Sequence, residues 1–430
     1  MSEEVQGVAV AEVGAPPVAP PHALAPLREW GFTTCWLAGI LAHSAQWMQS
    51  IAVPFIVYQL TESATWLGLA AVAGQAPALL ASPLGGVLAD RYSRRAILLI
   101  TLAIKIAVAC GFCALYNLDL LTPERMVALL IIGGFSATVH ITCWQAFVAQ
   151  LVPPDLIAQT YRLNAIQFNL SRAVGPAMAG IVLSTFGAGV AFAVNAAALV
   201  PMVIAIIAVR PRALTTPPPV SPMRAFMTGA KTAFAHRGLV VPIATAAFLS
   251  VFGQGLHPLM AGLAADVFQV GEQGFGMLMS SVGVASVVTA VSVVFFGDRA
   301  LRSHQASVGL FVYALGILTV GATDDYTVGL IGFAVTGVAH VLVHIHTTTA
   351  LQLHLDDELR GRVTSIYLLG IIASIPLGAQ VGGLLGDQIG LQNVVGLYGA
   401  AVLGYALYAH FFLDRLSDLD GNEPLDLSPS

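Results

Sequence analysis

The chain has 430 residues, of which 57% are hydrophobic and only 10% are charged. A soluble globular protein carries about 25% charged residues, so this chain cannot cover a water-facing surface of its size, and lipid must surround much of it. The net charge of −5 and the lack of a basic patch interleaved with aromatic residues exclude the nucleic-acid-binding class.

Residues 1–30 are acidic at the start and then rich in Ala and Pro. A secretory signal peptide needs a basic region followed by an apolar core, which this segment lacks. The composition predicts a disordered cytosolic tail.

Twelve apolar windows follow, each long enough for the roughly 20 residues that a membrane helix needs. They lie near 31–59, 65–89, 96–117, 126–151, 160–186, 189–209, 239–268, 274–296, 305–322, 327–352, 362–388 and 391–413. The pattern predicts an all-α membrane protein with twelve transmembrane helices.

Lys and Arg residues mark the cytosolic side of a membrane protein. We assign the gaps between windows alternately to two sides of the membrane. The side of the N-terminal tail then holds nearly all the Lys and Arg residues of these gaps, and the other side holds Arg125 alone. We therefore expect both termini in the cytoplasm of a cell whose plasma (inner) membrane holds the protein.

The longest connection, 210–238, begins with a Pro-rich piece and continues as a basic, partly amphipathic stretch. The sequences on its two sides repeat. A shift of 203 residues places Gly134, Gly175 and Gly180 on Gly337, Gly378 and Gly383, and a shift of 208 places Gly68 on Gly276 and Asp90-Arg91 on Asp298-Arg299. Duplicated halves with the substrate site between them are typical of transporters. We expect six-helix bundles at 31–209 and 239–413, a cytosolic linker at 210–238 and a cytosolic tail at 414–430.

The sharpest local pattern is GGVLADRYSRR at 85–95, between the second and third windows. It resembles the major facilitator motif between helices two and three, although Ser93 stands where a Gly is usual. The resemblance implies a conformational switch between the halves, formed by Gly86, Asp90, Arg91, Arg94 and Arg95. A plain positively charged cytosolic loop is the alternative reading.

The fifth window contains Gly175-Pro176 followed by Ala179-Gly180. This pattern is similar to the antiporter motif of major facilitator exporters, in which Gly175, Pro176 and Gly180 would permit a kink and close packing. Ordinary packing of small residues in a membrane helix remains the alternative.

The neighbouring segments LVPPDL at 151–156 and LRGRV at 359–363 resemble the branch of the superfamily that contains the enterobactin exporter and the macrolide-efflux transporters. The resemblance covers about 31–413. It implies secondary active efflux of a small organic molecule (a drug, siderophore or similar metabolite) by alternating access, usually as a proton antiporter. An importer, a lysophospholipid transporter or a metal-ion transporter of the same fold is the alternative.

Buried charges in a membrane are costly and often functional. Lys105 and Arg172 are the basic residues that lie clearly in the middle of windows, and no acid lies at comparable depth. We expect Arg172 to face the cavity and attract anionic or carbonyl-rich groups of the substrate. Pairing of Arg172 with backbone carbonyls, Gln167 or Asn169 is the alternative.

Other polar residues within the windows complete the predicted site. The predicted cavity residues are Gln46, Trp47, Gln49, His140, Asn169, Arg172, His257 and His344. Because His titrates near pH 6.5, His340 and His344 join Asp266 as candidates to carry a coupling proton. A packing role is the alternative for each His.

The sequence contains no nucleophile–base constellation, phosphate loop or metal motif. We therefore expect no enzyme activity, no cofactor and no metal site. The expected partners are a small-molecule substrate, protons and the lipid bilayer, with the protein as a monomer.

Overall fold

A computed structural model describes residues 22–79, 81, 88, 92–212, 222–296, 301–355 and 357–420, and these ranges contain helices and no strand. The long helices are α1 (Trp30–Thr61), α2 (Ala64–Gln75), α4 (Arg94–Asn117), α5 (Pro123–Val148), α6 (Ile157–Ala208), α7 (Pro222–Ala235), α8 (Arg237–Phe252), α10 (Glu272–Phe296), α11 (Arg302–Gly321), α12 (Tyr326–Leu353), α13 (Asp357–Ile389) and α14 (Leu391–Phe412). The prediction of an all-α protein is confirmed.

Nine segments within the described ranges are long and apolar enough to cross a membrane. Together with α1, α2 and the part of α6 before Gly187, they fit the predicted set of twelve spans. Large apolar side chains such as Ile100, Ile181, Phe295 and Phe411 are exposed on the outer surface. A surface of this kind suits the hydrocarbon core of a bilayer.

The helix α6 is 52 residues long and contains one break, at Gly187. Gly187 has φ 76° and ψ 174°, a conformation that glycine adopts without a steric penalty. The break falls between the predicted windows 160–186 and 189–209, so α6 comprises two spans joined by a single residue.

The predicted span at 239–268 corresponds to the apolar segment Gly238–Val267, but its helix is interrupted. The helix α8 ends at Phe252, a 3₁₀ turn follows at Gln254–Leu256, and α9 (Met260–Gly262) leads into a π-helical turn at Leu263–Val267. Gly253, Gly255 and Pro258 lie in the interruption. Irregular backbone at this depth is tolerated where protein or a cavity surrounds it.

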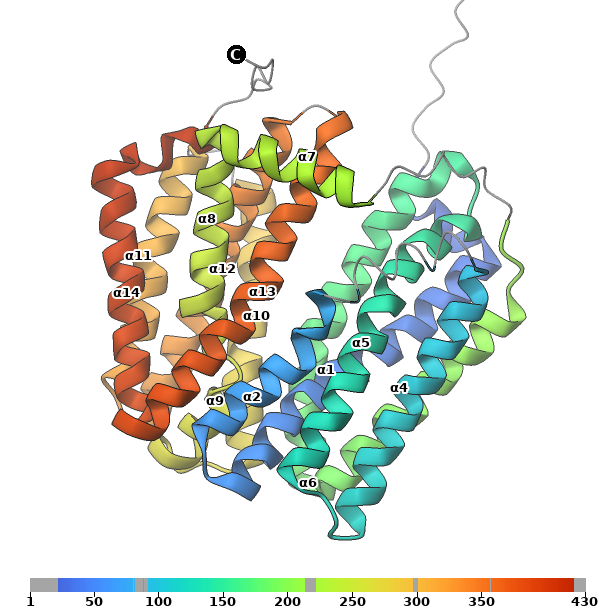
Figure 1. Cartoon of the computed structure of the whole chain (residues 1–430), viewed down its shortest axis with the longest axis horizontal. Coiled ribbons are helices and arrows are strands. Elements are labelled where there is room, and N and C mark those ends of the chain that lie inside the picture. The colour runs from blue at the N-terminus through green and yellow to red at the C-terminus, as the bar shows by residue number, and fades with distance from the viewer. Residues whose placement is uncertain are drawn as a thin grey trace, which may run out of the picture.

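The helices form two groups (Figure 1). The first group contains α1, α2, α4, α5 and α6, and the second contains α8 to α14. The linker helix α7 lies across one end of the second group, which we call the linker side; the opposite end is the far side. The groups meet where α2 packs on α13 and α6 packs on α10.

The glycines of the sequence repeat occupy matching crossings within the two groups. A side chain on Gly134 of α5 would overlap the backbone of Gly74 in α2, and one on Gly337 of α12 would overlap the backbone of Val282 in α10. Because lipid is as apolar as the helix faces, the hydrophobic effect does not drive membrane helices together, and they associate through close packing of this kind.

A second matched pair packs α6 and α13 within their own groups. Gly175 of α6 lies against α1 at Ser44 and Trp47, and Gly378 of α13 lies against the backbone of Val251 in α8. The third pair joins the groups to each other: Gly180 of α6 faces Gly276 of α10, and Gly383 of α13 faces Ala64 of α2. The repeat therefore sets both the packing within groups and the packing between them.

Replacing Gly378 with Ala should lower the stability of the protein by about 1–3 kcal/mol, because the added methyl group would overlap the Val251 carbonyl. Gly404→Ala in α14 is the matched control, since no atom lies within 4 Å of its added Cβ. Thermal unfolding in detergent measures both variants. Equal melting temperatures would contradict the role of close approach at Gly378.

Candidate functional site

A cavity of about 440 Å³ lies between the two groups of helices. Its size falls within the range of small-molecule sites. The lining residues include Gln46, Trp47, Gln49, Ser50, Val53 and Pro54 of α1, Gln75 of α2, Lys105 and Phe112 of α4, Leu129 and Leu130 of α5, Asn195 of α6, Gln254, His257 and Pro258 of the broken segment, Phe275 and Met279 of α10 and Ile375 of α13. Both groups therefore contribute to the wall.

The interruption after α8 brings polar groups to this wall. Gln254 belongs to the 3₁₀ turn, and His257 and Pro258 follow it directly. Because the backbone is not helical there, the chain can present these neighbouring residues together to the cavity. Discontinuous helices of this type form substrate sites in transporters.

Lys105 is the one formally charged residue among the described residues that line the cavity. Its Nζ donates a hydrogen bond to Gln46 Oε1 over 2.8 Å. Lys105 lies in the middle of α4, so its long side chain reaches the cavity from the interior of a membrane span. Lys105 was recognisable from the sequence as a buried cation, whereas Arg172 was expected to face the cavity.

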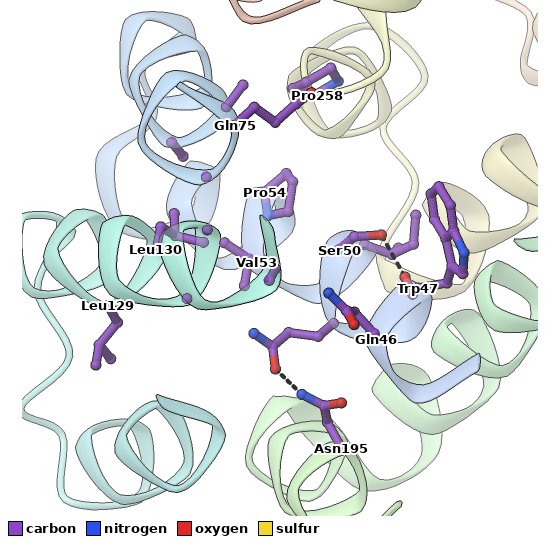
Figure 2. Close-up of a pocket in the computed structure, with 18 of the residues that line it drawn as sticks. Gln46, Trp47, Ser50, Val53, Pro54, Gln75, Leu129, Leu130, Asn195 and Pro258 are labelled. Atoms are coloured by element: carbon purple, nitrogen blue, oxygen red, sulfur yellow. Dashed lines mark hydrogen bonds between the residues drawn. The ribbon is translucent and has the colours of Figure 1, made fainter. Parts of the chain in front are cut away.

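A second polar contact lies beside the Lys105–Gln46 pair. Asn195 Nδ2 donates a hydrogen bond to Gln49 Oε1, and Figure 2 shows Asn195 approaching α1 from α6 with Gln46 nearby. Asn195 is 5% exposed, and its Oδ1 has no hydrogen-bond partner among the described residues. A buried acceptor without a partner is costly, so Asn195 Oδ1 marks a place for a donor from a bound molecule.

The predicted cavity residues fall into four sets, and His344 alone makes up the last of them. Gln46, Trp47, Gln49 and His257 line the cavity. His140 is buried next to it, where its Nδ1 lies 2.9 Å from Thr101 Oγ1, one turn before Lys105 on α4. The side chains of Asn169 and Arg172 lie outside the described residues, as does that of Pro176 from the predicted antiporter motif.

His344 lies in the second group, away from the cavity wall. Its Nδ1 is 2.9 Å from the hydroxyl of Tyr367 in α13, and that hydroxyl is 3.0 Å from Thr348 Oγ1. The ring of His340 stacks on that of His344 with their centroids 5.6 Å apart. These residues form a partly buried polar chain between α12 and α13.

The switch residues are only partly described. Gly86, Asp90 and Arg91 lie outside the described residues. The neighbouring Arg94 donates to the carbonyl of Ala146 over 3.3 Å, and Arg95 donates to the carbonyl of Ile207. Both arginines therefore bind backbone within the first group.

On the far side, a carboxylate of one group caps a helix of the other. Asp387 of α13 accepts hydrogen bonds from Ser63 Oγ at 2.6 Å, Ala64 N at 2.6 Å and Thr65 N at 3.1 Å. The two amides open α2 and have no partner within that helix. A carboxylate at a helix N-terminus is favourable, so this contact stabilises the joined state of the far side.

A second contact closes the same side. Tyr58 of α1 donates a hydrogen bond from its hydroxyl to the carboxylate of Asp266, next to the broken segment. Asp266 is exposed there rather than in the cavity. The sequence predicted neither partnership, because the bonded residues lie 208 and more than 300 positions apart in the chain.

Comparison with known proteins gives a family match over almost the whole chain. The model of a family described as transmembrane secretion effectors matches residues 21–429. The enterobactin exporter EntS of Shigella boydii is 22% identical over 367 residues, covering 83% of this chain and 86% of that protein. The same protein from several Escherichia coli strains matches equally, including strain ED1a.

Solved structures share the fold at low sequence identity. A bacterial homologue of the human lysosomal transporter Spinster, in an inward-facing and unoccupied conformation, has a TM-score of 0.72 and 15% identity, covering 91% of this chain and 98% of that one. The nucleoside transporter NupG has a TM-score of 0.72 and 13% identity over 90% of this chain and 99% of its own. The D-xylose–proton symporter has a TM-score of 0.66 and 17% identity over 92% and 99%.

Asp387→Ala should open the far side, because the first amides of α2 lose their cap. Loss of an N-cap costs about 1–2 kcal/mol, which corresponds to an increase in the separated population of about five- to thirty-fold. Double electron–electron resonance between spin labels at the exposed positions Gln59 and Gln388, in a background without native cysteines, measures this population.

Asp325→Ala is the matched control, since Asp325 caps α12 through Val328 N at 3.0 Å within a single group. This variant should lose stability without a change in the distance between labels. An unchanged distance distribution in Asp387→Ala would contradict the proposed effect of the cap.

Proposed function

Because the chain belongs to the transmembrane secretion effector family of major facilitator transporters, we propose that it is a secondary active exporter of a small organic molecule, working as a proton antiporter. The observation that carries the proposal is the family match over residues 21–429, which includes every residue that the structure describes. The cavity between the two groups of helices supplies the place where a substrate would bind.

We place the linker side in the cytoplasm of a cell's plasma (inner) membrane, with both termini on that side. Arg94 and Arg95 open α4, and Arg210 and Arg212 follow the end of α6, where the chain leads into the linker. Cytosolic loops prefer basic residues, which supports this orientation. The far side then faces outward. The Asp387 cap and the Tyr58–Asp266 bond hold it closed, so the cavity would load from the cytoplasm.

Export then follows from rocking of the two groups, 31–209 and 239–413, about the cavity. The far-side contacts would break as the linker side closes. Gly86, Asp90 and Arg91 are proposed to join the groups on the linker side in that second state, with Arg94 and Arg95 as neighbours. Gly175, Pro176 and Gly180 would shape α6 at the crossing with α10.

Protons are proposed to couple through the polar chain of the second group. The ring of His340 stacks on that of His344, and His344 forms a hydrogen bond of 2.9 Å with Tyr367. A His in this chain can change its charge at physiological pH, which neither Tyr nor Thr does. Asp266 is the alternative proton carrier, since its bond to Tyr58 belongs to the contacts that must break on opening.

Proteoliposomes with an imposed pH gradient test the proposal. Enterobactin, 8-anilinonaphthalene-1-sulfonate, ethidium and Hoechst 33342 form a panel of an iron chelator, an anion and cationic dyes. Movement of a compound against its gradient and opposite to the proton gradient, abolished by a protonophore, would support antiport. Accumulation in the direction of proton movement would indicate a symporter, and protonophore-insensitive equilibration would indicate a facilitator; either result would contradict the proposal.

His344→Gln should reduce the accumulation of substrate driven by a pH gradient at least tenfold. Exchange of substrate across a membrane without a gradient should continue. Loss of the titrating group removes coupling but leaves the cavity intact, because His344 is not part of its described wall. His346→Gln is the control on the same helix, since His346 is buried and lies outside the described wall of the cavity. Equal loss of driven uptake and exchange in His344→Gln would assign the residue to folding or packing.

A further inference from the structure

The charge in the cavity is unusual for its setting. Lys105 is the charged member of the described wall, and among the described residues no acid lies within ion-pair distance of it. The other polar lining groups are mainly amides: Gln46, Gln49, Gln75, Asn195 and Gln254. The described part of the wall therefore has a positive charge and no compensating negative one.

The hydrogen bonding of the Lys105 ammonium group is incomplete. An ammonium group carries three N–H donors, and the described residues give Lys105 one hydrogen bond, to Gln46 Oε1. Charged groups at membrane depth are retained mainly when they pair with other groups or face a cavity. The remaining donors of Lys105 point to an anionic group in the bound molecule, because bonds between an ammonium and an anion are stronger than bonds between neutral groups.

A second, independent observation points to a ligand at the same place. Asn195 Oδ1 is buried, has no partner among the described residues and belongs to the cavity wall. Its amide nitrogen is used by Gln49, which fixes the orientation of the side chain. A hydroxyl or N–H donor on the ligand would satisfy this oxygen.

The rest of the wall is apolar. Phe112, Leu129, Phe275, Met279 and Ile375 surround the polar patch from α4, α5, α10 and α13. An apolar body, partly aromatic, would fill this space by the same burial that fills most ligand pockets. A fully hydrated inorganic anion would leave these walls uncovered.

We propose that the cavity is selective for an organic anion with an apolar body, whose negative group binds Lys105 and whose hydrogen-bond donor binds Asn195. This inference rests on the proposed function, since it names the class of molecule that the exporter would carry. A cationic compound would meet the repulsion of Lys105 with no acid in the described wall to offset it. The histidines near Lys105, which are His43, His140 and the wall residue His257, add no negative charge at any pH.

Equilibrium binding to the purified protein in phosphatidylcholine nanodiscs tests the selectivity. The probes are 8-anilinonaphthalene-1-sulfonate and N-phenyl-1-naphthylamine, which share one ring system and differ by the sulfonate. Empty nanodiscs correct for partition into lipid. The saturable binding of the sulfonate should be at least tenfold tighter than that of the neutral compound.

The variants locate the effect at Lys105. Lys105→Gln should remove the tenfold preference, and Lys105→Arg should keep it. The chain has only one other lysine, Lys231 on the exposed face of α7, and Lys231→Gln is the matched control that should bind like the wild type. Equal affinity for the two probes, or a preference that survives Lys105→Gln, would overturn the proposal.

A labelling experiment keeps Lys105 in place, in case its replacement prevents folding. Lys231→Arg leaves Lys105 as the single lysine, so an amine-reactive ester followed by mass spectrometry of the peptide reports on it alone. The sulfonate should slow this labelling at least fivefold and the neutral compound should not. Equal protection by both, or displacement of the sulfonate by added phosphatidylglycerol, would overturn the proposal, the second result by assigning the cation to a lipid headgroup.

Binding and transport separate the two proposals. Sulfonate binding that depends on Lys105, without proton-driven movement of any compound, would support the anion site and contradict the antiporter. Driven transport of ethidium or Hoechst 33342 but not of the sulfonate would support the antiporter and contradict the anion site.

Discussion

The structure depends on close approach between helix backbones. In lipid, the surrounding solvent is as apolar as the helix faces, so helices associate through packing and hydrogen bonds rather than through the hydrophobic effect. The repeated glycines place six such crossings, four within the groups and two between them. They position α1, α2, α5, α6, α10 and α13, which all contribute residues to the cavity wall, so the shape of the site depends on these contacts.

Polar groups enter this apolar framework in pairs. Lys105 meets Gln46, Asn195 meets Gln49, and His344 meets Tyr367. In each case the two residues come from different helices, so the bond satisfies a polar group and fixes one helix against another. The pairing is incomplete at Lys105 and at Asn195 Oδ1, and both of these residues belong to the described wall of the cavity.

The sequence predicted the features that depend on composition and local pattern. It placed the spans, the division of α6 near Gly187 and the glycines of the repeat, because apolar length and small residues are visible along the chain. It could not determine which face of a span turns inward, since the membrane windows are apolar all round. For this reason it favoured Arg172, whose side chain lies outside the described residues, and did not assign Lys105 to the cavity.

The interruption at Gly253–Pro258 was missed for a related reason: a broken span has the same hydropathy as an intact one, and glycine and proline are tolerated in membrane helices. The Asp387 cap was missed because it joins residues more than 300 positions apart.

That cap has a kinetic consequence. When α2 and α13 separate, water can replace each partner, so neither state leaves a carboxylate or an amide unsatisfied. The cap therefore favours the closed state over the open one by only about 1–2 kcal/mol. A difference of this size alters the dwell time of the closed state about five- to thirty-fold and still lets the far side open.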